Sequence, residues 1–530
     1  MKVLEDILQQ GGDRGLIAES LLAMAKLGDP AVIEASVIEP RIRSYLDSAD
    51  QYLRDAALLA MGVLCNSASV APVSKLLEEQ TRAVAGGKPP RFDAVLVPYC
   101  LGRIGAWSGE PHTGDVAEFL RRRMRSTTDP TVEAAFVQAL GIAYLEQLVP
   151  APGRVSLPER LELLLALLED TGRAPEVRAM AAWALPRSVQ FVGTAAEGWA
   201  ASATQRVAET LLTSAGDTEA PLALRRQALL ALGTLARGTL PFAQRVRISE
   251  VLTNAAKEKD DTTSAAYAFL ALAALASDPG AVGELPARAT ACLVERLDGP
   301  EALRPWAALA CGLMGWELAD RGDHPKEVDA LRAAVRERLV ASRPEIGAYA
   351  VSAVLLGDAG ALLWLLEQLG TAAPERAREL ALALGQATAS DPPLAVSEKE
   401  LESLHAAIPT LRERMRGIGD DAELLVALAL ARKGLGDRTL GMDLLPGIVA
   451  GEPPARCAWI DAVVVTESAR AIEPLTKLLA DPEQPATVRV RAARALGELA
   501  NKDFFPWTAV FVRDLDLASA PSVLLDCADR

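Results

Sequence analysis

The stretch Val488-Arg489-Val490-Arg491-Ala492-Ala493-Arg494-Ala495-Leu496-Gly497 decides the fold of this chain. Its apolar residues recur at the spacing of an amphipathic helix, and small residues occupy its packing face. Similar segments occur along the whole chain, with clear examples at residues 53–62, 132–141, 225–233 and 376–385. Recurrence of one segment at this interval is typical of a repeat architecture.

The last residue of each segment is an anchor on which the repeats align. Thirteen anchors follow one another at intervals of 30 to 47 residues, namely Ala25, Gly62, Gly102, Gly141, Pro186, Gly233, Ala273, Gly312, Leu355, Gly385, Ala431, Val464 and Gly497. A second apolar-periodic helix precedes nearly every anchor helix, as at residues 71–77, 161–168, 204–212, 285–297 and 472–479. Small anchor residues let neighbouring helices approach closely.

Neither helix of such a pair buries its apolar stripe alone, so neighbouring pairs must stack. The sequence therefore predicts an all-α solenoid, a right-handed superhelix of about 13 helical hairpins. We expect residues 1–500 to form one continuous array. Residues 501–530 depart from the rhythm and form either a cap on the last repeat or part of an interaction surface.

The turns between helices carry matching signals. Leu27-Gly28-Asp29-Pro30 offers a glycine C-cap, an aspartate N-cap and a proline at the first helical position, in that order. The pairs Asp129-Pro130, Asp278-Pro279 and Asp481-Pro482 predict three further helix starts of this kind. Asp260-Asp261 and Asp420-Asp421 directly precede helices, where acidic side chains cap amides.

The pattern resembles HEAT repeats, especially the bacterial type called phycobilisome-lyase HEAT-like repeats. That family repeats an Asp-Pro turn and a Val-Arg-x-x-Ala-x-x-Ala-Leu-Gly helix. Residues 466–500 match best and residues 14–64 match nearly as well, whereas residues 140–470 share mainly the rhythm. The resemblance implies a solenoid that binds other molecules.

Composition excludes several classes of protein. The chain has 530 residues, of which 50% are hydrophobic, 24% charged and 4% aromatic, so it is not disordered. Its net charge of −15, with 44 arginines and 11 lysines, argues against a nucleic-acid partner. The excess of arginine over lysine, with abundant alanine and glycine, favours a GC-rich bacterial source.

Six cysteines are too far apart for a CxxC pair, namely Cys65, Cys100, Cys292, Cys311, Cys457 and Cys527. Most lie in apolar helical runs, which is typical of small buried residues in a reducing compartment. No run of 18 apolar residues predicts a membrane span, and the acidic N-terminus is unlike a signal peptide. We therefore expect a cytoplasmic protein without a membrane partner.

Residues that carry catalysis or bind metals are sparse. The three histidines, His112, His324 and His405, are more than 80 residues apart and lie in no metal-binding motif. Gly86-Gly87-Lys88-Pro89-Pro90 is the nearest approach to a phosphate loop, but proline stands where a helix with Ser or Thr should begin. We expect no catalytic residues, no metal and no cofactor.

Arginines form two dense groups, Arg121-Arg122-Arg123 with Arg125, and Arg412, Arg414 and Arg416. Each group ends the first helix of a pair, where cations favour the helix dipole. A docking site for an acidic partner is the alternative. A further set, Arg54, Arg178, Arg225 and Arg489, begins the second helix of a pair. Because equivalent arginines in HEAT-like repeats ladder with adjacent repeats, we expect them to be structural.

Long insertions separate some hairpins, at residues 106–115, 148–159, 189–204 and 318–327. We expect these loops to lie along one edge of the solenoid. They carry aromatic and histidine residues that favour partner binding, and Phe191 accompanies Trp199 in the third loop. The predicted contact residues are Trp107, His112, Trp199, Trp316 and His324. Each tryptophan could instead fold back over its own hairpin.

Three classes of function fit this sequence. The first is a non-catalytic scaffold that binds another protein, along the face formed by the second helices and along the loop edge. The second is a structural component of a larger assembly that self-associates. The third is an enzyme on a HEAT scaffold, such as a bilin lyase or an alkylpurine DNA glycosylase, and the net charge of −15 argues against the glycosylase.

Overall fold

The computed structural model of the chain describes residues 1–28, 33–88, 92–107, 112–144, 157–190, 197–235, 240–258, 261–279, 283–340, 345–385, 402, 405–418, 421–437, 439–466 and 468–500. Every regular element within these ranges is helical. The helices form thirteen successive pairs, which confirms the predicted all-α solenoid of helical hairpins. We name the first helix of each pair its A-helix and the second its B-helix. The predicted cap or tail, residues 501–530, lies outside the described residues.

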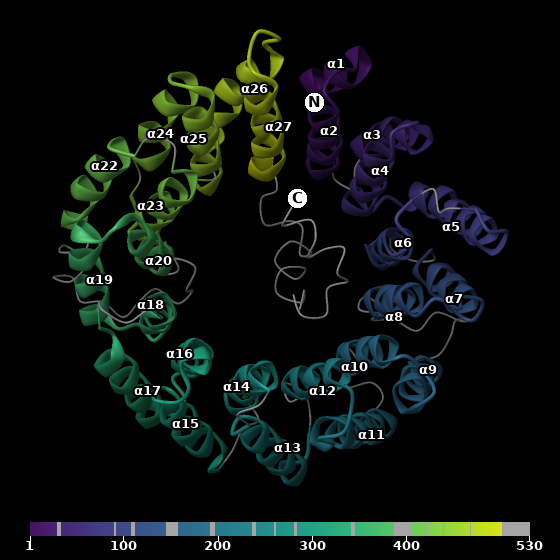
Figure 1. Ribbon diagram of the computed structural model, residues 1–530, viewed down its shortest axis with the longest axis vertical. Helices are drawn as coiled ribbons and strands as arrows, with labels where there is room; N and C mark the ends of the chain where they lie inside the picture. Colours follow the sequence, from purple (N-terminus) through teal and green to yellow (C-terminus); the bar gives the residue numbers. More distant parts are fainter. Residues whose placement is uncertain are drawn as a thin grey trace. The chain divides into compact units, whose positions relative to one another are not determined.

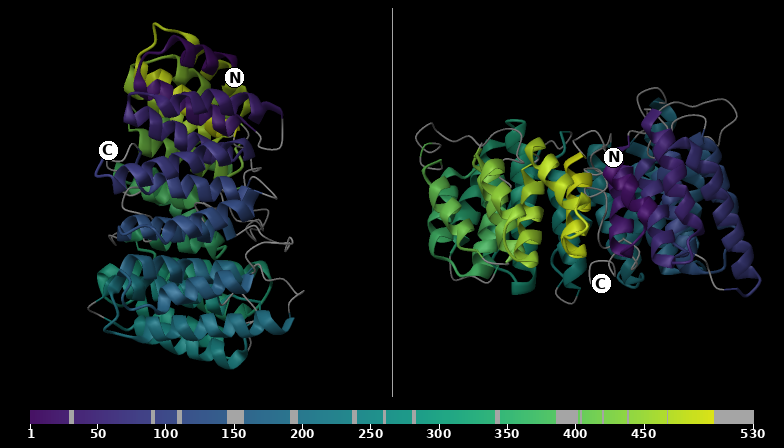
Figure 2. Two further views of the ribbon diagram at one scale, coloured as in Figure 1. Left: turned by 90° about the vertical axis from the view of Figure 1, so that its right-hand side faces the viewer. Right: turned by 90° about the horizontal axis from the view of Figure 1, so that it is seen from above.

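The chain divides into two compact units, and the first comprises residues 1–240 and the described end of the chain, 496–500. Its A-helices are α1 (Lys2–Gln10), α3 (Ile33–Arg43), α5 (Val70–Ala85), α7 (His112–Met124), α9 (Leu157–Glu169) and α11 (Glu197–Gly216). Its B-helices are α2 (Arg14–Leu27), α4 (Gln51–Leu64), α6 (Leu96–Trp107), α8 (Pro130–Tyr144), α10 (Pro175–Gln190) and α12 (Leu222–Leu235). Each A-helix packs on the B-helix that follows it, and successive B-helices pack on one another. Two layers result (Figure 1), with the hairpins stacked as the left view of Figure 2 shows.

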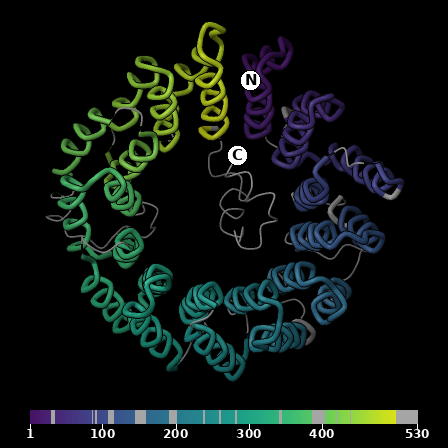
Figure 3. Tube along the Cα trace, viewed as in Figure 1, coloured from purple at the N-terminus to yellow at the C-terminus, as the bar shows by residue number. Residues whose placement is uncertain are grey.

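The second unit comprises residues 241–495. Its A-helices are α13 (Phe242–Ala255), α15 (Leu285–Arg296), α17 (Pro325–Arg338), α19 (Ala359–Thr371), α22 (Ile408–Arg416), α24 (Leu440–Val449) and α26 (Ile472–Ala480). Its B-helices are α14 (Thr262–Ala276), α16 (Arg304–Asp320), α18 (Ile346–Leu355), α20 (Pro374–Gly385), α23 (Ala422–Gly434), α25 (Pro453–Val465) and the first part of α27 (Ala486–Ala500). The chain alternates between the A-layer and the B-layer, which can be followed along the tube in Figure 3.

Each of the thirteen predicted anchors lies in a B-helix. At the anchors Gly102, Gly141, Gly312 and Gly385, the next B-helix leaves no room for a side chain. A Cβ atom added at Gly102 would lie 2.6 Å from the carbonyl oxygen of Ala139, and one at Gly312 would lie 2.7 Å from the Cα of Ser352. The same close approach occurs within the first unit between Gly497 and Ala23. Small anchors therefore set the spacing of the B-layer, as predicted.

Arginine at the fourth position of a B-helix joins the two helices of one hairpin. The Nε atoms of Arg178, Arg225 and Arg489 donate to the carbonyl oxygens of Leu168, Ala215 and Leu479, at 2.9, 3.2 and 3.0 Å. Each acceptor is the second-last residue of the preceding A-helix, whose final carbonyls have no partner within the helix. The arginine thus supplies both a hydrogen bond and a cation at the negative end of the helix dipole.

Arg54 and Arg456 occupy the same fourth position. Arg54 donates to the carbonyl oxygens of Ser48 and Ala49, at 2.8 and 2.9 Å, and Arg456 donates to that of Ile448 at 3.3 Å. The predicted structural role of Arg54, Arg178, Arg225 and Arg489 is therefore supported. The carbonyl oxygens named above lie in the arginines' own hairpins, because the end of the preceding A-helix is close to this position.

Several of the predicted caps are confirmed. The Gly28 amide closes α2 by donating to the carbonyl oxygens of Met24 and Ala25, at 3.1 and 3.3 Å. Asp129 accepts from the Thr131 amide at 2.8 Å at the start of α8. Asp261 and Asp421 cap α14 and α23 through amides three residues further on, at 3.1 and 3.0 Å.

Two of the predicted Asp-Pro helix starts are wrong. Asp278 follows α14 and accepts from Arg245 of α13 at 2.6 Å, with both side chains 4% exposed. Leaving the buried Arg245 guanidinium without a counter-charge would cost more free energy than leaving a helix without a side-chain cap. Asp278 therefore pairs with Arg245. Asp481 ends α26 and accepts from the Glu483 amide at 3.0 Å, so it shapes the turn that precedes α27.

We predict that Gly102→Ala destabilises the chain. The added methyl group would meet the backbone of Ala139, which cannot move without shifting α8. Overpacking of this kind costs about 1–3 kcal/mol and outweighs the roughly 1 kcal/mol that alanine contributes to helix propensity. Gly370→Ala in α19 is the matched control, because nothing lies within 4 Å of its added Cβ atom. Urea titrations followed by circular dichroism should show a lower midpoint for the first variant and an unchanged or higher one for the second.

Candidate functional site

Four of the five predicted contact residues, all except His324, lie in helices instead of loops. Trp107 is the last residue of α6, His112 the first of α7, and Trp199 lies in the first turn of α11. The side chains of all three lie outside the described part of the structure, so their predicted contacts stay predictions. Phe191 also lies outside it, with residues 108–111 and 191–196 of the two insertions.

The predicted loop at residues 318–327 is wrong for most of its length. Helix α16 continues to Asp320 and α17 begins at Pro325, so only residues 321–324 form a turn. Trp316 lies inside α16 and is half-exposed, with its indole N–H buried and without an acceptor among the described residues. The helix continues because the apolar spacing of its first turns extends through Leu313 and Trp316.

His324 occupies the N-cap position of α17 in the left-handed conformation, with φ of 50°. Its Nδ1 atom lies 3.8 Å from a carboxylate oxygen of Glu327, and its side chain is 32% exposed. Trp316 and His324 thus lie on different elements, one in a B-helix and the other at the start of the next A-helix.

Among the described residues, α16 is the B-helix on which two large apolar side chains are exposed. Trp306 and Leu313 are 39% and 40% exposed, and Leu309 and Trp316 are half-exposed. The spacing of three, four and three residues places all four on one stripe of the helix. This stripe faces away from the A-layer, since the opposite side of α16, around Cys311 and Leu318, is buried.

The neighbouring B-helices extend this surface. Leu270 of α14 and Leu355 of α18 are half-exposed, and Leu355 lies beside Gly312 of α16. Neither α14 nor α18 contains a charged residue. We call this apolar surface the α16 panel, and its members are Leu270, Trp306, Leu309, Leu313, Trp316 and Leu355.

Sequence reasoning placed Trp316 in a loop and overlooked Trp306 and Leu313. The signal was present, because the segment from Arg304 to Asp320 has apolar residues on every side of the helix. A B-helix in a two-layer stack is covered by its A-helix and by the B-helices on either side, so apolar residues on its remaining side must stay exposed or bind a partner.

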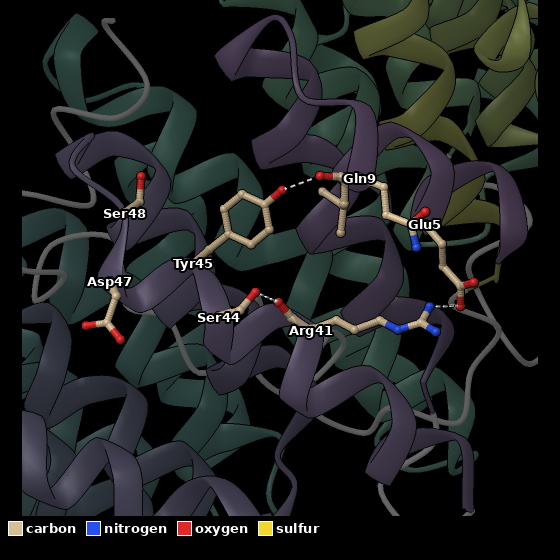
Figure 4. A pocket seen from close by; sticks show the side chains of 8 residues that line it. Glu5, Gln9, Arg41, Ser44, Tyr45, Asp47 and Ser48 are labelled. Carbon is tan, nitrogen blue, oxygen red and sulfur yellow. Dashed lines mark hydrogen bonds and ion pairs between the residues drawn. The ribbon is translucent and has the colours of Figure 1, made fainter.

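A cleft of about 430 Å³ opens near the N-terminus, between α1 and the segment from α3 into the 3-10 helix Ser44–Asp47 (Figure 4). Its polar groups bind one another. Arg41 pairs with Glu5, the Tyr45 hydroxyl donates to the Leu8 carbonyl oxygen at 2.8 Å, and the Ser44 hydroxyl donates to the Arg41 carbonyl oxygen at 2.7 Å. We therefore interpret these residues as a structural junction between helices.

Five of the seven arginines in the two dense groups are engaged within the protein. Arg121 and Arg122 pair with Glu118 of their own helix, and Arg123 pairs with Glu78 of α5. In the second group, Arg414 donates to the carbonyl oxygens of Leu369 and Ala372, the latter at 2.6 Å, and Arg412 pairs with Asp443. These contacts support the structural interpretation of both groups.

The cysteines behave as buried apolar residues. Cys100 and Cys311 are fully buried, and burial raises the pKa of both thiols, that of Cys311 to about 12. The Cys65 thiol lies 2.9 Å from the Gly62 carbonyl oxygen, which agrees with its buried position. Cys457 is half-buried, and Cys527 lies outside the described residues.

Three carboxyl groups have a raised pKa, and they lie on different helices. Burial is the main cause for Glu39 of α3, Asp55 of α4 and Asp461 of α25. Arg43 opposes the shift at Glu39, and Arg491 opposes it at Asp461. No group of three or more potential metal ligands occurs in the part of the chain that the structure describes. Among the same residues, no helix is both long and apolar enough to span a bilayer.

Comparison with known proteins adds no family. No family model matches the chain, and no curated protein matches it. Two engineered proteins solved by the Northeast Structural Genomics Consortium are similar at a low level. The first is 18% identical, with a TM-score of 0.28, and the match covers 94% of this chain and 99% of the other. The second is 19% identical, with a TM-score of 0.26, and the match covers 52% and 96%.

We predict that Asp55→Asn raises the free energy of unfolding at pH 7. One Asp55 carboxylate oxygen is buried without a partner among the described residues, and burial raises the pKa more than the hydrogen bond from the Asp93 backbone lowers it. The pKa of Asp55 is higher in the folded state than in the unfolded state. Its contribution to the free energy of unfolding is therefore present at low pH and is lost as the pH rises through the folded pKa. The advantage of the variant should shrink towards pH 4, near the unfolded pKa. Urea midpoints of both proteins at pH 7 and pH 4 measure it, and an equal difference at both pH values would contradict the prediction.

Proposed function

We propose that this chain is a non-catalytic scaffold of the HEAT-repeat type that binds another protein through the B-layer of its second unit. The observation that carries this proposal is the α16 panel, where two tryptophans and a leucine stripe remain accessible on a helix. Contiguous exposed apolar surface of this kind marks interaction sites, and tryptophan is enriched among the residues that dominate binding energy.

The rest of the B-layer supports this proposal by its rigidity. Two glycines bring α16 close to α18. Gly312 has no room for a side chain beside Ser352, and Gly315 has none beside Leu356. A rigid helix presents its side chains without a large ordering cost on binding. The panel is therefore preorganised for contact with a partner.

Self-association is a second candidate function, and α24 favours it. Met442, Pro446 and Val449 are exposed along one stripe of this A-helix, and Met442 and Val449 are 51% and 62% exposed. A second copy that covers this stripe would join solenoids through their A-layers. A contact of this kind suits the second class of function that fits the sequence, a structural component of a larger assembly that self-associates.

We propose a reducing compartment, the bacterial cytoplasm, as the location of the chain. Buried thiols support this proposal, since Cys100, Cys292 and Cys311 lie among apolar side chains and form no disulfide. The engaged arginine groups support a protein partner over a nucleic acid, because paired guanidinium groups are poorly placed to bind phosphates.

We predict that Trp306→Ala with Leu313→Ala removes a partner captured from a lysate of the source cells. Truncating central apolar contacts typically costs 2 kcal/mol or more, which is a loss of about 30-fold in affinity. The melting temperature should fall by only a few degrees, roughly the effect of 1 kcal/mol, because both side chains are partly exposed and lie outside the fully buried core. Mass spectrometry identifies the partner, and circular dichroism checks the fold.

The matched control is Leu222→Ala in α12, an exposed leucine on a B-helix of the first unit. This control should retain the partner at the wild-type level. Retention of the same partner by the folded double variant would contradict the proposal. Loss of the partner in both the control and the double variant would show a general effect of apolar surface instead of a specific site.

A further inference from the structure

The α16 panel has a shape that fits a helix. Its central stripe runs from Trp306 to Trp316, ten residues along a rigid helix, which corresponds to about 15 Å or nearly three turns. Leu270 on one neighbouring helix and Leu355 on the other flank the stripe. Ridges and grooves on this scale match those that one helix presents to another when they pack.

The exposed charged residues at the borders of the panel are acidic, and the nearby Arg304 and Arg321 are paired within the protein. Asp320 continues the stripe by one further turn beyond Trp316 and is exposed, and Glu317 lies beside it. At the start of α18, the exposed Glu379 of α20 lies against Gly347. The panel therefore has carboxylates at its borders on two different helices.

No exposed cation offsets these carboxylates among the described residues of α14, α16 and α18. Arg304 is the single basic residue of these three helices, and it is engaged by the Gly299 carbonyl oxygen at 2.9 Å and by Glu345 at 3.1 Å. A ligand of the panel must therefore combine apolar surface with positive charge.

We propose that the α16 panel binds an amphipathic helix of another protein, whose apolar face covers the tryptophan and leucine stripe and whose flanking Lys or Arg residues pair with Asp320 and Glu379. This inference rests on the proposed scaffold function and names the chemistry of its partner. Helix-in-groove recognition of this kind reads apolar anchors at helical spacing, and charge at the rim selects the partner.

Charge also argues against the two occupants that the chain itself could supply. A second copy carries a net charge of −15. Residues 501–530 are apolar in part but contain five aspartates against one lysine and two arginines. Both would bring like charge to the carboxylates, and like charges in contact oppose binding.

The test uses the full-length chain and two synthetic peptides. Both form amphipathic helices of about 14 residues, long enough to cover the stripe, with leucines at identical positions. The remaining positions are lysine in one peptide and glutamate in the other. Fluorescence anisotropy of labelled peptide measures affinity, and we expect the Leu/Lys peptide to bind at least 10-fold more tightly than the Leu/Glu peptide.

Leu313→Glu separates binding at the panel from general attraction of a cation to an acidic protein. The change adds a negative charge, so general attraction to the Leu/Lys peptide would increase. Burial of Leu313 beneath the peptide predicts the opposite, a loss of at least 10-fold. Leu222→Glu is the matched control, since it adds the same charge to an exposed leucine, 51% exposed, at the first position of α12.

Asp320→Asn together with Glu379→Gln should weaken the Leu/Lys peptide several-fold at low salt and have little effect at high salt, where exposed charges are screened. Three results would overturn the inference: equal affinity for the two peptides, unchanged affinity after Leu313→Glu, or dimers of the wild type that Leu313→Glu dissociates in sedimentation. The last result would identify a second copy as the occupant. If the lysate partner depends on the panel but neither peptide binds, the scaffold function stands and the assigned partner chemistry is wrong.

Discussion

Close approach of neighbouring B-helices at small residues is the contact on which the rest of this structure depends. At Gly102, Gly141 and Gly312, an added Cβ atom would meet atoms of the next B-helix at 2.6 to 2.7 Å. This spacing brings the leucines and alanines on both sides of each helix into contact and excludes water from the B-layer. Because every repeat contacts mainly its neighbours, the same contact must recur in each one.

A second set of interactions orients the A-helices on this layer. Arginine at the fourth position of α4, α10, α12, α25 and α27 donates to backbone carbonyl oxygens. These oxygens lie in the last turn of the preceding A-helix or, for α4, in the segment that follows it. Inside the second unit, the buried Arg432 joins Asp437 at 2.6 Å and Asp443 at 2.5 Å. Backbone carbonyl oxygens hold the first five guanidinium groups in place, and two carboxylates neutralise that of Arg432.

The same packing rule explains why the apolar α16 panel exists. A B-helix in a two-layer stack contacts its own A-helix and the B-helices on either side, and its fourth side has no neighbour in the stack. In α12 this side carries the half-buried Arg226, Leu230 and Thr234. Helix α16 places Trp306 and Leu313 there instead, and burial of this surface by a partner would remove apolar area from water.

The sequence by itself determined the helical hairpins, their number and their anchors, because helical periodicity and the requirement for small residues at close contacts are local signals that repeat. It also predicted the caps at Asp129, Asp261 and Asp421, which depend on only the next three residues. Asp278 could not be predicted, because its partner Arg245 lies 33 residues earlier and only the folded unit brings the two together. Trp306 and Trp316 show the same limit: periodicity places both on one stripe, but only the tertiary structure decides which side of a helix its neighbours leave uncovered.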